Sequence, residues 1–202
     1  MIEVMTVHKD VLEKEMTSTQ KFILSMDTCQ WWNAVEMQAC RFYQILKQPH
    51  GGTPWDKDEQ ISAFVADRMF LIVAIFHAIE NLEKMNLELS RKGDNSLQII
   101  LNDIEHVAPL KDIKNLRDMN IHKLDYLVEK GQKKEQFRTT ISEGDRQHLT
   151  TAAWTHIDHD TNSVFLGNVN LGKLLEVFNK HLPFVRTKTR EVYDQELFGS
   201  RK

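Results

Sequence analysis

The sequence has few residues that form disulfides or interrupt helices and strands: among 202 residues there are 2 Cys, 4 Pro and 8 Gly. Cys29 and Cys40 are eleven apart on one predicted helix, about 16 Å along its axis, which excludes a disulfide between them. We expect two buried or idle thiols in a reducing compartment. The densest apolar run, from Met69 to Phe76, is far shorter than the roughly 20 residues that cross a membrane.

Two further absences narrow the class of protein. The first sixteen residues carry four acidic side chains and no long apolar core, unlike a secretory signal. The net charge is only −3, so the chain as a whole has no attraction to nucleic acid or to anionic membranes. We therefore expect a cytoplasmic protein with no membrane partner, in which any RNA binding depends on a local surface.

The residues that are present describe an ordinary globular protein, with 41% apolar and 27% charged residues. This length supports a single domain with a sizeable core. Residues 1–16 are expected to be an N-terminal extension or a frayed helix start, and residues 17–198 the domain itself.

Four stretches have helical periodicity. Thr17 and Gln20 form a capping box before a helix to about Leu46, and Asp56 with Glu59 forms a similar start for a long helix to about residue 91. Gly93 stops that helix. Between Met69 and Ile79 it is apolar on nearly every side, which predicts a central position. Shorter helices are expected over residues 97–104, capped by residues 94–96, and over about 109–130, ending at Gly131.

The pattern changes after residue 136. Residues 137–142, 150–158 and 163–166 are rich in Thr, Val, Ile and Trp, which predicts two or three short strands. Asn168 or Asn170 then opens a last helix, with Pro183 predicted to kink or break it before a second piece to about Phe198. The fold class is thus mainly α: an antiparallel bundle of four to five helices with a small β-hairpin insertion, at about residues 137–166, before the last helix.

Reactive side chains concentrate between Asn115 and Tyr126. At 100° per residue, Arg117 falls within the apolar face of its helix, whereas Asp118, His122 and Tyr126 share another stripe. A carboxylate beside the imidazole would orient it and favour its charged form. Arg117 and His122 diverge by about 140°, so they meet only if the Arg side chain curls round or a second copy supplies one of them.

The run from Arg117 to His122 resembles the signature of the HEPN superfamily: Arg, a polar residue, three residues of any kind, then His. Members of that superfamily are bundles of four or five helices. They include metal-independent endoribonucleases that dimerise so that two motifs face one cleft, as well as inactive binding modules and toxin components. The resemblance implies a homodimer that cleaves or binds RNA, with toxin–antitoxin or defence roles in view and no cofactor.

The same resemblance assigns roles to three residues. His122 would handle the proton of an RNA 2′-hydroxyl or of the leaving oxygen, and Arg117 would stabilise charge on the phosphoryl group. Asp118 would position one of them. Cleavage by a 2′-hydroxyl needs no metal, and the pKa of His suits proton transfer near neutrality.

Each of these residues also has a structural interpretation. Arg117 could form a buried salt bridge to Glu80 or Asp67 on the long helix. His122 and Asp118 could be an exposed i, i+4 pair that adds a few tenths of a kcal/mol to the helix. On this interpretation the protein is a catalytically inactive helical module for dimerisation or for binding a protein partner.

Two other groups are candidates for function. His77, Glu80, Asn81 and Lys84 form a polar stripe that either lines the same cleft as Arg117 or marks where the long helix reaches water. His156, Asp158, His159 and Asp160 suggest a metal cluster, with His77 or His148 as a further ligand, but a polar hairpin tip is the preferred interpretation and no metal site is predicted.

Aromatic residues and basic residues could each contribute to RNA binding. Trp31, Trp32, Phe42 and Tyr43 are expected in core and dimer packing rather than in a base-stacking platform. The basic residues fall in two short groups, which are Lys130, Lys133, Lys134 and Arg138, and later Lys180, Arg186, Lys188 and Arg190.

Overall fold

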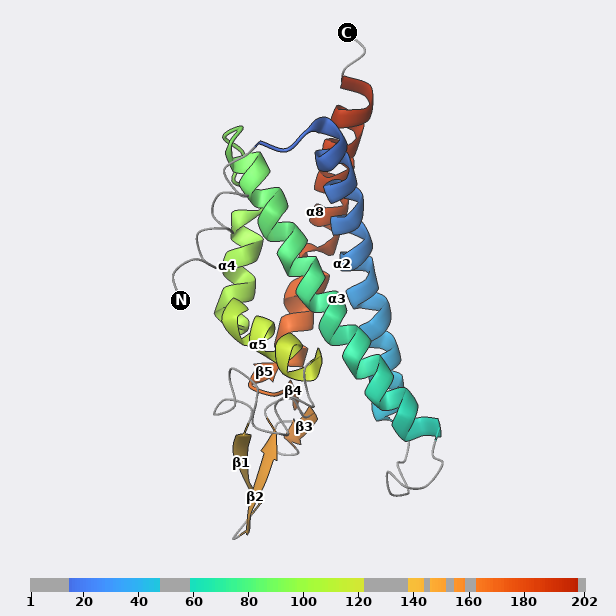
Figure 1. The fold of residues 1–202 in the computed structure, drawn as a ribbon, viewed down its shortest axis with the longest axis vertical. Coiled ribbons are helices and arrows are strands. Elements are labelled where there is room, and N and C mark those ends of the chain that lie inside the picture. Colours follow the sequence, from blue (N-terminus) through green and yellow to red (C-terminus); the bar gives the residue numbers. More distant parts are fainter. Residues whose placement is uncertain are drawn as a thin grey trace.

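The protein is mainly helical in the computed structural model, which describes residues 15–47, 59–121, 138–143, 146–151, 155–158 and 163–199. A small set of strands precedes the last helix, so the predicted fold class is confirmed (Figure 1). The helices are α2 (Ser18–Leu46), α3 (Glu59–Ser90), α4 (Gln98–Val107), α5 (Leu110–Ile121) and α8 (Leu171–Phe198).

Three long helices, α2, α3 and α8, build the main body of the bundle, and the shorter α4 and α5 lie on one side of it (Figure 1). Trp32 and Phe42 on α2 are fully buried, and the Trp32 ring packs 4.5 Å from that of Phe178 on α8. The Trp32 indole donates a hydrogen bond of 3.1 Å to the carbonyl of Ala78. Side chains of this size contribute roughly 1.5–3 kcal/mol each when buried. The predicted central position of α3 is also confirmed, since Leu71, Ala78 and Leu82 are wholly buried.

The described residues form five strands in two small antiparallel sheets, whereas two or three strands were predicted. β1 (Arg138–Glu143) pairs with β2 (Arg146–Thr151), with Arg138 opposite Thr151. β3 (Thr155–Asp158), β4 (Ser163–Leu166) and β5 (Val169–Asn170) form the second sheet. The predicted strand over residues 150–158 was wrong because it merged the end of β2 with β3. Buried residues of β4 and β5 attach the second sheet to the helices, and these are Val164, Leu166 and Val169.

Local signals set the helix ends as the sequence predicts. The Thr17 hydroxyl accepts from the backbone N–H of Gln20, while the Gln20 side chain accepts from the Thr17 N–H, which completes the capping box. Gly93 follows α3 with a φ of 83°, a conformation that only glycine adopts readily. The Asn170 side chain caps α8 by accepting from the backbone of Lys173.

Pro183 does not break the last helix, so the predicted break was wrong, whereas the alternative of a kink at Pro183 stays a prediction. One helix runs from Leu171 to Phe198 with Pro183 inside it. Leu182 and Val185, on either side of the proline, are buried in the core. Their burial offsets the hydrogen bond that a proline removes from a helix.

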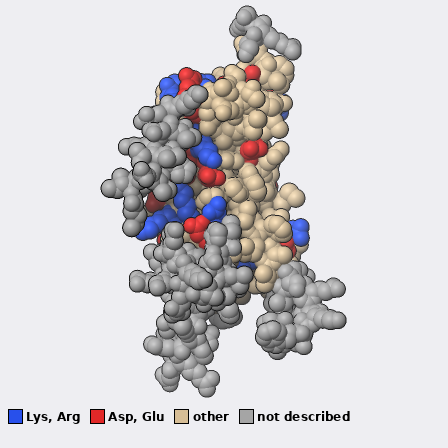
Figure 2. Space-filling model, in the orientation of Figure 1, with Lys and Arg blue, Asp and Glu red and all other residues tan. Residues whose placement is uncertain are grey.

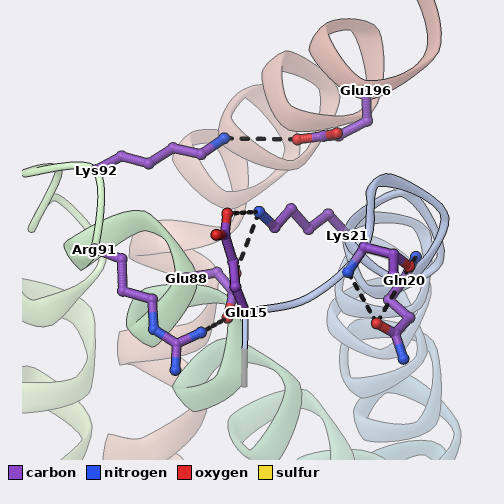
Figure 3. A network of polar contacts seen from close by, with 8 residues as sticks. Glu15, Gln20, Lys21, Glu88, Arg91, Lys92 and Glu196 are labelled. Carbon is purple, nitrogen blue, oxygen red and sulfur yellow. Dashed lines mark hydrogen bonds and ion pairs between the residues drawn. The ribbon is translucent and has the colours of Figure 1, made fainter. Parts of the chain in front are cut away.

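A polar network ties three helices together at one end of the bundle (Figure 3). The Lys21 amine on α2 lies 2.9 Å from Glu15 and 3.6 Å from Glu88 of α3, and Glu88 also pairs with Arg91. Lys92 reaches Glu196 of α8 at 3.6 Å. The hydrogen bond to Glu15 raises the pKa of Lys21, although burial opposes that rise. The network thus links α2 to α3 through Lys21 and Glu88, and the end of α3 to α8 through Lys92 and Glu196.

Two further sequence predictions concern sulfur and membranes. Cys29 and Cys40 both carry free thiols, so the excluded disulfide is confirmed. Within the described ranges, none of the helices combines the length and the apolar character that crossing a bilayer requires.

Candidate functional site

The α5 helix carries the first half of the motif. Its inward face packs against the bundle through buried residues, which are Ile113, Leu116, Met119 and Asn120. Arg117 and Asp118 lie at the edge of that face, with side chains about one third exposed, at 33% and 34%. His122 and Tyr126 lie outside the described residues.

The Arg117 guanidinium has two neighbours that fix its plane. One nitrogen donates to a carboxylate oxygen of Asp118 at 2.6 Å. The central carbon lies 4.5 Å from the centre of the Phe76 ring on α3, which is cation–π geometry. The structure thus brings Arg117 and Asp118 together, whereas the helical pattern placed them on separate sides. Residues one apart diverge by 100°, but the long Arg side chain spans that angle.

The predicted partners of Arg117 were wrong. Asp67 is buried and pairs with Arg41 of α2 at 3.1 Å. Glu80 lies 3.3 Å from Lys84 and 3.4 Å from His77. Arg117 is therefore not sealed in the core by a carboxylate from the long helix, and its guanidinium remains accessible.

Arg117 and Asp118 line a cleft of about 1070 Å³ between α3, α4 and α5. Phe76, Glu80 and Lys84 contribute from α3, and Glu105 from α4. Of the polar stripe, Glu80 and Lys84 line this cleft, whereas His77 and Asn81 are not among its described lining residues. Asn81 is buried instead, at 8% exposure.

Charges of both signs alternate along the cleft. Lys84 pairs with Glu80, and Lys114 of α5 pairs with Glu83 of α3, both at 3.3 Å. Figure 2 shows positive and negative side chains next to one another on the α3–α4 side of the visible face, while the α2 side is largely uncharged. Each cation that lines the described cleft therefore has a carboxylate partner, and the cleft is not a positively charged channel.

A row of rings runs from the cleft to α2. The Phe76 ring meets the His77 ring edge-on at 5.2 Å, and the His77 ring lies 4.7 Å from that of Trp31. Trp31 is half-buried, while Trp32 and Phe42 belong to the core, as predicted for them. Tyr43 is also half-buried, and burial raises the pKa of its hydroxyl.

The second basic group predicted from the sequence is neutralised by acidic partners. Its pairs are Lys180 with Asp103, Arg186 with Glu36, Lys188 with Asp94, and Arg190 with Asp194. The hydrogen bond from Lys180, and to a smaller extent that from His181, holds the pKa of Asp103 below its ordinary value. Of the first basic group, Lys130, Lys133 and Lys134 lie outside the described residues, as does the side chain of Arg138.

The suggested metal cluster lies mostly where the structure does not describe the chain. His159 and Asp160 are outside it, and only the backbone of His156 and His148 is described. Among the described side chains, no three of His, Cys, Asp and Glu gather as metal ligands would.

Lys114 and Phe76 are among the site residues that were missed from the sequence. Lys114 lies three before Arg117, a spacing that puts both on one side of a helix and could have revealed it. Phe76 gave no such signal, because its contact with Arg117 joins residues 41 positions apart and depends on how α5 packs on α3.

No family model matches the chain, and no curated protein and no solved structure is significantly similar to it.

Proposed function

We propose that the protein is a HEPN-like endoribonuclease that works without a metal, with Arg117, Asp118 and His122 as its active groups. The supporting observation is that the Arg117 side chain, one third exposed, lines the cleft, with its guanidinium in contact with Phe76 and Asp118. A guanidinium kept in the core by a salt bridge would have no access to substrate. The proposal includes the cytoplasmic location expected from the sequence.

The reaction is a transesterification. The 2′-oxygen of a ribose attacks the adjacent phosphorus, the bond to the 5′-oxygen breaks, and a 2′,3′-cyclic phosphate remains. One base removes the 2′-hydroxyl proton and one acid protonates the leaving oxygen, which is work suited to His122. Arg117 stabilises the charge that grows on the phosphoryl oxygens. Asp118 holds the guanidinium in place through the bond at 2.6 Å.

An RNA-cleavage assay in excess chelator tests this function. We expect the wild-type protein to cleave RNA and to leave cyclic phosphate ends, and His122→Ala and Arg117→Ala to lose roughly 100-fold or more in rate. Arg190→Ala is the matched control, because Arg190 is 83% exposed on α8 and pairs only at 3.8 Å. The proposal is wrong if wild type shows no cleavage, or if both motif variants cleave as fast as the control.

A second function, self-association, is favoured by the uncharged surface of α2 and α3. Met37 of α2 and Phe70 and Val65 of α3 are 64%, 59% and 44% exposed. The α2 side of the visible face carries few charges (Figure 2). Exposed apolar patches of this kind mark interaction sites. We propose that a second copy of this chain covers it, which would bring two α3–α4–α5 clefts into one assembly.

Sedimentation of the purified protein tests the dimer. We expect wild type to sediment as a dimer and Phe70→Glu as a monomer, because a charge in the centre of an apolar contact is costly to bury. Phe184→Glu is the control, since Phe184 is 43% exposed on α8. A monomeric wild type, or equal behaviour of both variants, would remove the dimer from the proposal.

A further inference from the structure

Large apolar side chains line the cleft between α3, α4 and α5 alongside its charged ones. They are Phe76 and Leu87 of α3, Leu101 of α4 and Leu110 of α5. Leu87 is 37% exposed. Charges of both signs line the same cleft and pair with one another, as Lys84 does with Glu80. A groove between helices that is partly apolar and has little excess charge suits the apolar face of another helix.

The described chain begins at Glu15, near one end of this cleft. The Glu15 carboxylate lies 2.9 Å from the Lys21 amine, which in turn lies 3.6 Å from Glu88 of α3 (Figure 3). The hydrogen bond from Lys21, and to a smaller extent the charge of Arg91, lowers the pKa of the Glu15 carboxyl. In Figure 1 the first described residues, in dark blue, extend from the start of α2 toward the end of α3. Because Ser90 lines the cleft, residues 1–14 join the described chain at the Ser90 end of it.

Residues 1–14 have the sequence pattern of an amphipathic helix. At 100° per residue, an arc of about 160° holds almost only apolar side chains. Its members are Met1, Val4, Met5, Val7, His8, Val11 and Leu12. The rest of the circumference is polar apart from Ile2, and the stretch contains no Gly or Pro. A helix this short is marginal in water by itself, so it needs a surface that covers its apolar face.

The length of such a helix matches the cleft. Between Phe76 and Ser90, α3 borders the cleft over about 21 Å, at about 1.5 Å per residue, and fourteen helical residues have the same length. We propose that residues 1–14 form an amphipathic helix that binds in the α3–α4–α5 cleft of the same chain, with its apolar face toward the cleft. The connection at Glu15 places residue 14 at the Ser90 end and residue 1 at the Phe76 end.

The covalent connection selects the chain's own segment over that of a second copy. A segment tethered at the end of its binding site has an effective concentration in the millimolar range, roughly. A segment from another copy would have to bind at the much lower concentration of the protein in solution. The contact is therefore intramolecular, and it closes the cleft without an added partner.

Hydrogen–deuterium exchange of the full chain, followed by mass spectrometry, tests the inference. We expect the amides of residues 1–14 to exchange at least about tenfold more slowly than those of a synthetic peptide with the same sequence. The rates should not change with protein concentration, because the contact lies within one chain. Exchange as fast as in the peptide would overturn the inference. Protection that appears only at high protein concentration would overturn it too, because a second copy would then be the source.

Variants locate the contact. Val4→Asp combined with Val11→Asp places charges on the apolar face, and Leu87→Asp places one in the cleft, so exchange of residues 1–14 should return to the rate of the peptide. Thr6→Asp, on the polar side, is the control for the first. Ile99→Asp is the control for the second, because Ile99 is 63% exposed on α4 and is not among the described cleft lining.

Thermal unfolding establishes that each variant is folded, and the double variant carries the test if Leu87→Asp does not fold. Full protection in a folded Leu87→Asp or in the double variant would overturn the inference. Equal loss of protection in the two controls would do the same, since the contact would then not be specific to the apolar face and the cleft.

One consequence rests on the proposed function. A helix in the cleft would cover Arg117 and Asp118, which line it, so the Val4→Asp, Val11→Asp variant should cleave RNA several-fold faster than wild type. If residues 1–14 are protected as expected but neither protein cleaves RNA, the nuclease proposal fails and the helix in the cleft stands. If both proteins cleave RNA at one rate and residues 1–14 exchange like the peptide, the nuclease proposal stands and the helix in the cleft fails.

Discussion

The network around Lys21 and the lining of the cleft both contain pairs of basic and acidic side chains. The Lys21–Glu88 pair is buried, whereas the Arg117–Asp118 pair is partly exposed. The Lys21 and Glu88 side chains are 9% and 8% exposed, and their contact joins helices 67 positions apart in the chain (Figure 3). Arg117 and Asp118 are neighbours in sequence and are about one third exposed. A buried pair between distant helices contributes to the fold, whereas a pair of neighbours on a cleft wall holds no helices together. The second kind of pair is the one that a ligand can recruit.

The largest effect on stability should come from Glu88→Ala. Among the described residues, it leaves the exposed Glu15 as the carboxylate partner of the buried Lys21 amine, and it removes the contact between Glu88 and Arg91. Removing one member of a buried pair costs about 3–5 kcal/mol, and the remaining contact with Glu15 reduces this to roughly 2–3 kcal/mol. Urea unfolding at pH 7 measures it. A loss below about 1 kcal/mol would mean that the network is not structural.

Replacing both members should cost less than replacing one. Lys21→Met combined with Glu88→Leu removes two buried charges and leaves apolar side chains of similar size. We expect the double variant to be within about 1.5 kcal/mol of wild type, because buried ion pairs are often no better than apolar packing. The same urea titration measures the coupling between the two sites. If the double variant is less stable than Glu88→Ala, the apolar replacement does not pack.

The cleft pair should behave in the opposite way. Arg117→Ala removes an ion pair that is one third exposed and a cation–π contact, so we expect a loss below about 1 kcal/mol in unfolding free energy. The same variant should abolish RNA cleavage. Comparing both quantities on one protein sample separates function from folding. A stability loss as large as that of Glu88→Ala would return Arg117 to a structural role.

Contacts close in sequence were the ones that could be predicted. The capping box of Thr17 and Gln20 and the Asn170 cap each depend on residues three apart, and Gly93 on its own conformation. The predicted strand over residues 137–142 corresponds to β1, but the start of β2 at Arg146 was missed, even though Gly144 and Asp145, residue types common in turns, stand between the two strands in the sequence.

Contacts between distant elements were not predictable from the pattern. The apolar periodicity placed Arg117 in the core and so suggested Glu80 or Asp67 as its partner. The packing of α5 on α3 determines the neighbours of Arg117 instead, because it places the guanidinium over the Phe76 ring. Pro183 is a similar case, because burial of Leu182 and Val185 keeps α8 continuous where local propensity favours a break.

The smallest expected effect on stability concerns Asp94, in the turn after α3, which pairs with Lys188 of α8. Hydrogen bonds from Lys188 and from Ser96 lower the pKa of Asp94 to about 2. A carboxylate whose pKa is lowered by folding stabilises the fold at every pH above its pKa in the unfolded chain, which is near 4. That contribution disappears as the pH falls toward 2. Because the pair is partly exposed, we expect Asp94→Asn to cost less than about 1 kcal/mol at pH 7. Urea unfolding of both proteins from pH 7 to pH 2.5 should show the difference narrowing below pH 4, and Asp194→Asn, on an exposed pair of α8, is the control. A difference that is constant across this range would mean that the Asp94 charge does not stabilise the turn.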